Sequence, residues 1–337
     1  MLEPSAHLRE DIFEPKESAP TRDGFGKGVV EAAHTDTRIV VLTADLAEST
    51  RAEWFQKEFP ERFIEMGVAE QNMAAVAAGM AAAGKIPFIT SYAMFNPGRN
   101  WEQIRTTIAL NEIPVIICGM HAGVSVGPDG ATHQALEDIA LMRVVPNMTV
   151  ISPCDAEEAR KATIAAAKSG RPTYLRFGRS ATPMMTTAAS PFEIGKATVF
   201  WEGQTFQESG RSDLPKVALL ATGPLVYQAL LAARELEKEG VWATVVNVHT
   251  IKPLDEATIV AVARKCGAVV TIEEHQIAGG FGSAVAELLA RTAPTSQRFV
   301  GVHDAFGQSG EPAELIEHYG MAAHHIVAAA LEISKGR

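Results

Sequence analysis

The stretch "FIEMGVAEQNMAAVAAGMAAAG" occupies residues 63–84 and decides how the first half of the chain can fold. Its second part predicts a helix over 70–83, because Ala and Met are strong helix formers and no proline interrupts them. Small and apolar side chains stand on nearly every face of this helix, which indicates burial on several sides. A single acid, Glu70, opens the helix, and its position in so apolar a segment needs an explanation.

Residue chemistry alone leaves two interpretations of Glu70 open. A carboxylate in the first turn of a helix gains about 0.3–1 kcal/mol from the helix dipole, which is a purely structural reason for its presence. A buried carboxylate, however, needs a partner or takes up a proton. The helix N-terminus favours the anion and burial favours the acid, so this group could also be set to share a proton with a ligand.

Short β-branched runs alternate with helical stretches on both sides of this segment, and the alternation restarts after a Pro/Gly/Ser/Thr-rich stretch at 181–215 that includes a possible hairpin at 196–203. The sequence predicts strands over 38–44, 86–90, 113–119, 148–152, 172–177, 217–223, 243–251 and 268–274, and helices over 24–34, 70–83, 99–110, 155–170, 224–239, 255–265, 282–292 and 321–334. Apolar strands separated by helices are typical of parallel sheets covered on both faces. We therefore expect an α/β fold of two domains, each with a mostly parallel sheet covered by helices.

Composition narrows the class of protein. The chain has 337 residues, 47% of them hydrophobic, and a net charge of −10, which predicts a globular protein and argues against a nucleic-acid surface. The charged N-terminus has no apolar core, and no apolar run approaches membrane-spanning length, so we expect a cytoplasmic protein without a membrane partner. Cys118, Cys154 and Cys266 show no metal-ligand spacing, which favours reduced thiols and no metal site in this chain.

Three glycine-containing stretches differ in how strongly they indicate a function. GVSVG (123–127) matches the nucleophile elbow of α/β-hydrolases, but a Pro-Asp-Gly turn follows it where that motif requires a helix. GGFG (279–282) lacks the third glycine of a dinucleotide-binding fingerprint. The stretch 119–138 is the densest, because it offers His121, Asp129 and His133 on a loop between a strand and a helix, where functional residues concentrate.

Taken together, several segments resemble the thiamine-diphosphate-dependent transketolase family. They are TADLAEST (43–50), FIEMGVAEQNM (63–73), TSYAMF (90–95), GPDGATHQALED (127–138), PCDAEEA (153–159), YLRFGRS (174–180), VHTIKPLD (248–255) and EEHQIAGGFGSAVAE (273–287). The resemblance covers nearly the whole chain in the family's order. It implies an N-terminal extension over 1–20, a pyrimidine-binding domain over 21–185, a linker over 186–215 and a transketolase C-terminal domain over 216–337.

The family's diphosphate- and metal-binding domain, marked by Gly-Asp-Gly followed later by Asn, has no counterpart here, because Gly127-Pro128-Asp129-Gly130 is not that motif. The resemblance therefore implies the C-terminal subunit of a split, two-subunit transketolase. A separate N-terminal subunit would hold the diphosphate together with Mg²⁺ or Ca²⁺. We expect an α2β2 heterotetramer with active sites between unlike chains.

The resemblance also implies roles for individual residues. Glu70 would hydrogen-bond the N1′ atom of the cofactor's aminopyrimidine ring and share a proton with it, which activates thiamine diphosphate. His133 would act near the reacting carbon. The other cofactor-binding positions are Asp45, Leu46, Tyr92 and Phe95, and the substrate-binding positions are Arg22, Ser49, His121, Asp129 and Arg179. A third aromatic expected after Phe95 is absent, and Trp101 could compensate for it.

The implied reaction is the transfer of a two-carbon ketol unit between ketose and aldose phosphates. Two alternatives use the same cofactor: the β subunit of a 2-oxo-acid dehydrogenase, which has the same two domains, and an enzyme like 1-deoxyxylulose-phosphate synthase. A third alternative is a non-catalytic regulatory partner of a transketolase. The Thr-His-Gln motif and the filled phosphate positions favour transketolase, and the presence of Glu70 argues against a purely regulatory chain.

Overall fold

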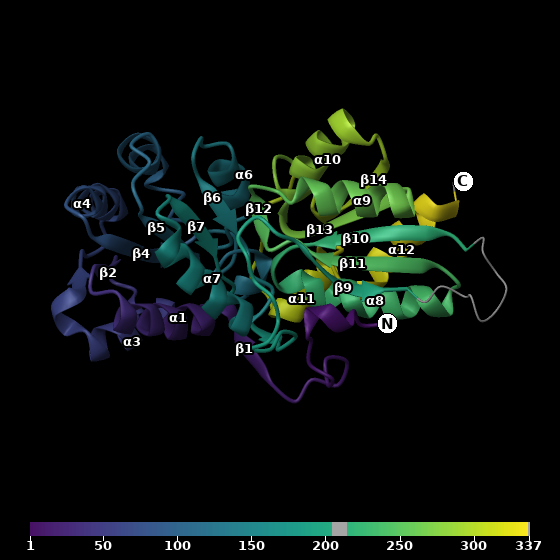
Figure 1. Cartoon of the computed structure of the whole chain (residues 1–337), viewed down its shortest axis with the longest axis horizontal. Coiled ribbons are helices and arrows are strands. Elements are labelled where there is room, and N and C mark those ends of the chain that lie inside the picture. Colours follow the sequence, from purple (N-terminus) through teal and green to yellow (C-terminus); the bar gives the residue numbers. More distant parts are fainter. Residues whose placement is uncertain (204–213, 336–337) are drawn as a thin grey trace.

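The computed structural model describes residues 1–203 and 214–335. Two helix-covered sheets lie side by side along the long axis of the molecule (Figure 1). A small antiparallel ribbon, β1 (Ser18–Pro20) with β8 (Ala181–Pro183), joins the start of the first half to its end. The predicted α/β class is therefore confirmed.

The first sheet has seven strands in the order β12-β6-β7-β5-β4-β2-β3. They are β2 (Ile39–Thr43), β3 (Phe63–Glu65), β4 (Ile86–Tyr92), β5 (Ile116–Met120), β6 (Thr149–Ile151), β7 (Thr173–Arg176) and β12 (Thr250–Lys252). All pairs are parallel except β12 with β6. Parallel pairing brings the carboxyl ends of β2, β4 and β5 to one edge of the sheet, where ligands of such sheets bind.

Helices cover both faces of this sheet. They are α1 (Thr21–Thr35), α2 (Ala47–Thr50), α3 (Ala52–Glu58), α4 (Glu70–Ala82), α5 (Trp101–Gln103) continued by a π-helical segment (Ile104–Ala109), α6 (Asp138–Arg143) and α7 (Ala156–Ser169). Helices α1 and α7 pack closely because Gly24 has no side chain. A Cβ there would lie 2.0 Å from the carbonyl oxygen of Ala156. The helix expected over 99–110 forms over 101–109, and hydrogen bonds of the wider π pattern span its larger part, Ile104–Ala109.

Helix α4 lies at one end of the molecule (Figure 1) and is buried on one face only. Met73, Ala74 and Ala77 face the core, whereas Ala75 and Val76 are exposed. The prediction of burial on several sides is therefore wrong for the single chain. An apolar helix face remains uncovered.

The second sheet has the order β14-β13-β10-β11-β9, in which only β9 is antiparallel to its neighbour. Its strands are β9 (Thr198–Glu202), β10 (Lys216–Ala221), β11 (Trp242–Asn247), β13 (Ala268–Gln276) and β14 (Ser296–Val302). The helices of this half are α8 (Val226–Lys238), α9 (Glu256–Cys266), α10 (Phe281–Thr292), α11 (Pro312–His318) and α12 (Ala323–Lys335). Residues of α8 and α12 share one core with the sheet, while those of α9 and α10 join a core that continues into the first half.

The segments that connect the two halves differ from the sequence-based expectation. The hairpin expected at 196–203 is wrong, because β9 pairs with β11 as the edge strand of the second sheet. The strand expected over 243–251 ends at Asn247, and β12 then extends the first sheet. Ala6 and Ile12, in the N-terminal extension, are fully buried in the core of the second half. Within the expected linker, residues 204–213 lie outside the described residues.

Two further expectations concern membranes and thiols. Within residues 1–203 and 214–335, no helix combines the length and apolar character needed to cross a membrane. Cys118, Cys154 and Cys266 are all buried and unpaired, as expected for reduced thiols.

Candidate active site

Glu70 is the first residue of α4 and is only 2% exposed. Ser91, at the carboxyl end of β4, donates from its hydroxyl to Glu70 Oε1 over 3.1 Å, whereas the buried Oε2 has no hydrogen-bond partner. Asn100 donates to the Glu70 backbone carbonyl over 3.2 Å and fixes the start of the helix. A buried carboxylate oxygen without a partner is costly, so this position is prepared for a ligand that donates a hydrogen bond.

Aromatic rings gather next to the carboxyl end of β4. Tyr92 stacks on Phe95, with 6.4 Å between ring centroids, and on His121, with 4.3 Å between them. The His133 ring meets both Tyr92 and Phe95 edge-on, at 5.9 and 5.5 Å. The structure thus brings together four of the residues that the sequence analysis selected, from the end of β4 and from the loop between β5 and α6, and presents ring surfaces on which a flat heterocycle can pack.

Arg22 extends this cluster from α1. Its Nη1 donates to the Ser49 carbonyl oxygen over 2.7 Å and lies 2.7 Å from Nε2 of His121. Burial, together with the nearby charges of Arg22 and Arg179, lowers the pKa of His121 to about 3. His121 is therefore neutral near pH 7 and can accept a hydrogen bond from Arg22, whose buried Nε has no partner. These donors suit an anion such as a phosphate.

Arg179 lies beyond the end of β7, and its Nη1 donates to the Val126 carbonyl oxygen over 2.7 Å. It is close enough to His121 to influence that side chain electrostatically. Three candidates remain, namely Asp45, Leu46 and Asp129. Asp45 is exposed, its backbone N–H donates to Glu65 Oε1, and Leu46 precedes α2. Asp129 is exposed on the turn before Gly130, and its side chain makes no hydrogen bond to another described residue.

The chain matches two family models, "Transketolase, pyrimidine binding domain" over residues 17–185 and "Transketolase, C-terminal domain" over 210–326. A solved structure titled "Split gene transketolase, inactive beta4 tetramer" is 44% identical, has a TM-score of 0.85, and is matched over 94% of this chain and 98% of that chain. This chain belongs to the transketolase family.

Two further comparisons show how much of a transketolase this family member corresponds to. A 6-deoxy-6-sulfo-D-fructose transketolase subunit from Clostridium sp. (strain MSTE9) is 40% identical over 93% of this chain and 94% of its own length. A transketolase from Campylobacter jejuni is 25% identical with a TM-score of 0.78, and the match covers 96% of this chain but 49% of that one. The chain is thus similar in extent to transketolase subunits and to about half of a longer transketolase.

Sequence reasoning missed several residues that shape this transketolase-family site. Ser91 was not selected, although its place at the end of a buried parallel strand is a usual signal for function. Asn96 and Asn100 were also missed: Asn96 donates to the carbonyl oxygens of Ile89 and Cys118, and Asn100 donates to Asn96 Oδ1. Trp101 does not join the rings. Its indole N–H donates to the Leu141 carbonyl oxygen, and its side chain packs on the core that extends through both halves.

The two competing motifs have structural explanations. Ser125 of GVSVG lies in a short 3-10 turn (Val124–Val126) that no helix follows, so it is not a nucleophile elbow. At the start of α10, the N–H groups of Phe281 and Gly282 both donate to Glu273, so the chain's own carboxylate occupies the position that a nucleotide phosphate would need.

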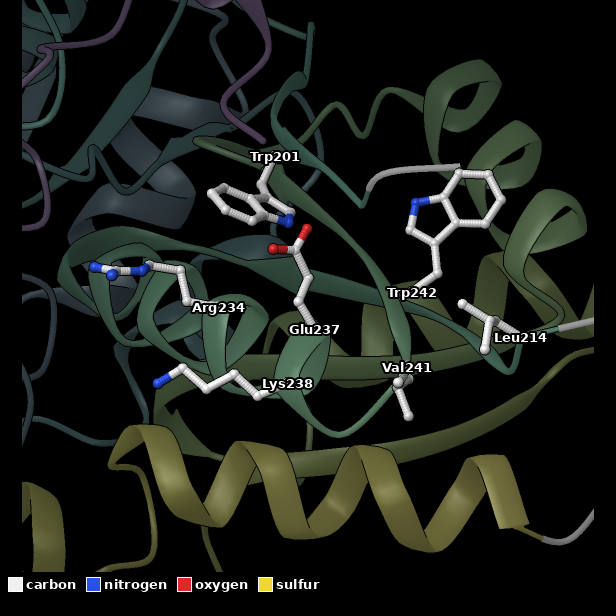
Figure 2. Close-up of a pocket in the computed structure, with 8 residues that line it drawn as sticks. Trp201, Leu214, Arg234, Glu237, Lys238, Val241 and Trp242 are labelled. Atoms are coloured by element: carbon white, nitrogen blue, oxygen red, sulfur yellow. The ribbon is translucent and has the colours of Figure 1, made fainter. Parts of the chain in front are cut away.

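The second half of the chain also has a hollow and a group of possible metal ligands, and neither contains a candidate residue. A hollow of about 420 Å³ places Glu237 between two tryptophans (Figure 2), and it is lined by Trp201, Leu214, Arg234, Glu237, Lys238, Gly240, Val241 and Trp242. In the part of the chain that the structure describes, one group of side chains has metal-ligand spacing, namely Glu317, His324 and His325. Glu317 and His324 are exposed, and such groups are common on protein surfaces without an ion.

Proposed function

We propose that this chain is the C-terminal subunit of a two-subunit transketolase that transfers a two-carbon ketol unit between ketose and aldose phosphates. The observation that carries the proposal is the unpartnered Oε2 of buried Glu70, whose other oxygen is held by Ser91, the residue before Tyr92 in β4. A structural first-turn acid would bond backbone N–H groups of its own helix or a neighbouring side chain through both oxygens.

The residues present fit the pyrimidine end of thiamine diphosphate. Glu70 would accept a hydrogen bond from the ring, Ser91 would keep the carboxylate oriented, and Tyr92 and Phe95 would pack on the ring face. When bound, this cofactor supplies an electron sink for cleavage of a carbon–carbon bond. The exposed position of Asp45 and the half-buried position of Leu46 are compatible with a cofactor that continues toward another subunit.

Arg22, Arg179 and neutral His121 form the proposed phosphate end of the site, with Ser49 beside them. Two guanidinium groups give charge-assisted hydrogen bonds of defined geometry to a phosphate. His133 lies edge-on to the rings of Tyr92 and Phe95, where it would move a proton of a sugar hydroxyl, and Asp129 stands on the same loop. The name of the Clostridium relative refers to a sulfo sugar, so a sulfonate is the alternative anionic group for this end of the site.

The proposal includes an N-terminal partner subunit that holds the diphosphate and a Mg²⁺ or Ca²⁺ ion. Helix α4, which begins with Glu70, has an exposed face with Ala75 and Val76, and Val68 before it is 76% exposed. Apolar faces of this kind are covered in obligate assemblies. The solved split relative is described as an inactive tetramer of one chain, so we expect this chain alone to be inactive as well.

Reconstitution tests the proposal. We expect no ketol transfer from the chain alone with thiamine diphosphate and Mg²⁺, and transfer between sugar phosphates once the N-terminal subunit is added. Light scattering of the active complex should give the mass of an α2β2 heterotetramer. Full activity of the lone chain, or of a stable αβ heterodimer, would contradict the corresponding part of the proposal. Oxidative decarboxylation of a 2-oxo acid by the complex would favour the dehydrogenase alternative.

A further inference from the structure

The loop Gly123–Gly127 lies against the proposed phosphate end of the site. Its ends, Gly123 with φ of 87° and Gly127 with φ of 82°, adopt a backbone conformation that favours glycine. From one side, Arg179 donates to the Val126 carbonyl oxygen and the Ser180 hydroxyl donates to the Ser125 carbonyl oxygen, each over 2.7 Å. The position of this loop and that of the Arg179 guanidinium are therefore coupled.

On its other side, the loop is held by a carboxylate from the C-terminal domain. Glu274, in β13, is 3% exposed, and its Oε1 accepts a hydrogen bond from the Ser125 backbone N–H over 2.6 Å. A Cβ on Gly123 would lie 2.3 Å from the same oxygen, so the carboxylate fills the space that a side chain would occupy. Hydrogen bonds to a charged acceptor are about twice as strong as neutral ones.

Glu274 is itself fixed in place by buried groups of the pyrimidine-binding domain. Arg176 Nη2 donates to the Glu274 carbonyl oxygen over 2.8 Å, and Arg176 Nε donates to Asp138 over 2.7 Å. The Tyr174 hydroxyl donates to the same Asp138 oxygen over 2.7 Å. Arg176 and Asp138 are 5% and 2% exposed, so this arrangement cannot shift without leaving a buried charge unpaired.

A cavity of about 400 Å³ adjoins this contact. Ser125, Ser180, Glu274, Tyr227, Gln228 and Ile316 are among the residues that line it. Gln134 Nε2 also donates to the Val124 carbonyl oxygen over 2.9 Å, so the Glu274–Ser125 hydrogen bond is one of the side-chain restraints on the loop. Without the carboxylate, the loop has space to move.

We infer that Glu274 is a positioning residue of the substrate site. Held by Arg176, it fixes the Gly123–Gly127 loop and thereby sets Arg179 for the anionic end of the sugar. Glu274 acts through the loop and does not touch the substrate. This inference rests on the proposed function for its link to substrate binding, and it gives the C-terminal domain an indirect part in that binding.

Glu274→Ala and Glu274→Gln, each assembled with the N-terminal subunit, test the inference. We expect Glu274→Ala to raise KM for a ketose phosphate about tenfold, the scale of one charge-assisted hydrogen bond, with kcat changed less than KM. Glu274→Gln keeps an acceptor oxygen and should restore most of the affinity. The neighbouring Glu273→Gln is the matched control, because Glu273 is equally buried but bonds Phe281 and Gly282 within its own domain. It should leave KM unchanged.

Backbone hydrogen exchange gives a readout that does not need activity. In the chain, Glu274→Ala should speed exchange of the Ser125 amide, and Glu273→Gln should not. Unchanged exchange of Ser125, or a KM for Glu274→Ala equal to that of the parent complex, would overturn the inference. If the parent complex transfers no ketol unit, the proposed function fails, while exchange at Ser125 still decides whether Glu274 holds the loop.

Discussion

Helices α4 and α7 each carry a buried glutamate in the first turn, and the two carboxylates are bonded in different ways. Glu158, 3% exposed in the first turn of α7, accepts hydrogen bonds at both oxygens, from the Cys154 N–H over 2.6 Å and from Asn247 Nδ2 over 2.7 Å. Glu70, 2% exposed at the start of α4, accepts one from Ser91 and leaves Oε2 without a partner. Both positions satisfy the same helix-dipole preference.

The comparison sets a structural acid beside the proposed ligand-binding one. The bonds of Glu158 close the first turn of its helix and attach it to Asn247 in the C-terminal domain. Those of Glu70 orient the carboxylate but leave one oxygen for another molecule. Burial and position in the helix are shared, so only the count of partners distinguishes the two.

The strongest test of this contrast is Glu70→Ala. Loss of a group that handles a proton in the reaction typically costs 10²–10⁴ in rate, so we expect at least a roughly hundredfold fall in ketol transfer. The melting temperature should fall less than in Glu158→Ala, because Glu70 accepts one hydrogen bond, from Ser91, whereas Glu158 accepts two. A large loss of stability with activity retained would make Glu70 a structural acid like Glu158.

Arg179→Ala tests whether the ligand-binding character extends from Glu70 to the phosphate end. Losing one charge-assisted contact costs about 1.5–3 kcal/mol, which corresponds to roughly a ten- to hundredfold higher KM for phosphorylated sugars. Unphosphorylated sugars serve as the control and should be affected much less. Equal effects on both kinds of sugar would refute the phosphate role of Arg179.

For Glu158→Ala we expect the opposite pattern. The change leaves the Cys154 N–H without a partner and Asn247 Nδ2 with only the weak acceptor Cys154 Sγ, at 3.7 Å, and an unsatisfied buried group costs about 1–3 kcal/mol. Thermal or urea unfolding of the chain should show this loss, while the KM of the folded complex stays near the parent value. Unchanged stability would show that the two bonds of Glu158 contribute nothing that water cannot replace.

The smallest expected effect is on pH dependence. Burial, followed by the nearby charge of Asp155, raises the pKa of Glu158 from its ordinary 4.5 to about 7. Between these values the folded chain binds a proton that the unfolded chain releases, so stability falls as the pH rises from 4.5 to 7. Glu158→Gln should flatten part of this fall in melting temperatures measured at pH 5 and pH 8. An identical slope in the variant would contradict the raised pKa.

The local pattern of the sequence was sufficient to predict many of the helices and strands. The helix predicted over 155–170 forms as α7, with Asp155 accepting from the Glu158 N–H and Gly170 ending the helix at φ of 66°. The start of α4 at Glu70 is likewise confirmed. Capping side chains, apolar strands and helix formers act over a few residues, and a single sequence displays them directly.

Contacts between distant segments could not be predicted in the same way. Glu274 and Ser125 are 149 residues apart, and nothing in either segment indicates their hydrogen bond. The same holds for β12, which leaves its own domain to extend the first sheet, and for the burial of Ala6 and Ile12. The proposed roles of Glu70, His133 and the arginines came from family resemblance, and they stay predictions until the variants are measured.

Exchange of the thiazolium C2 proton of thiamine diphosphate in the assembled complex tests the central claim most directly, because it reports cofactor activation without any sugar. We predict that the complex with Glu70→Gln exchanges this proton at least about a hundredfold more slowly than the parent. The complex with Glu158→Gln should exchange at the parent rate. Equal exchange rates in the Glu70→Gln and parent complexes would contradict the claim that the open oxygen of Glu70 is reserved for the cofactor.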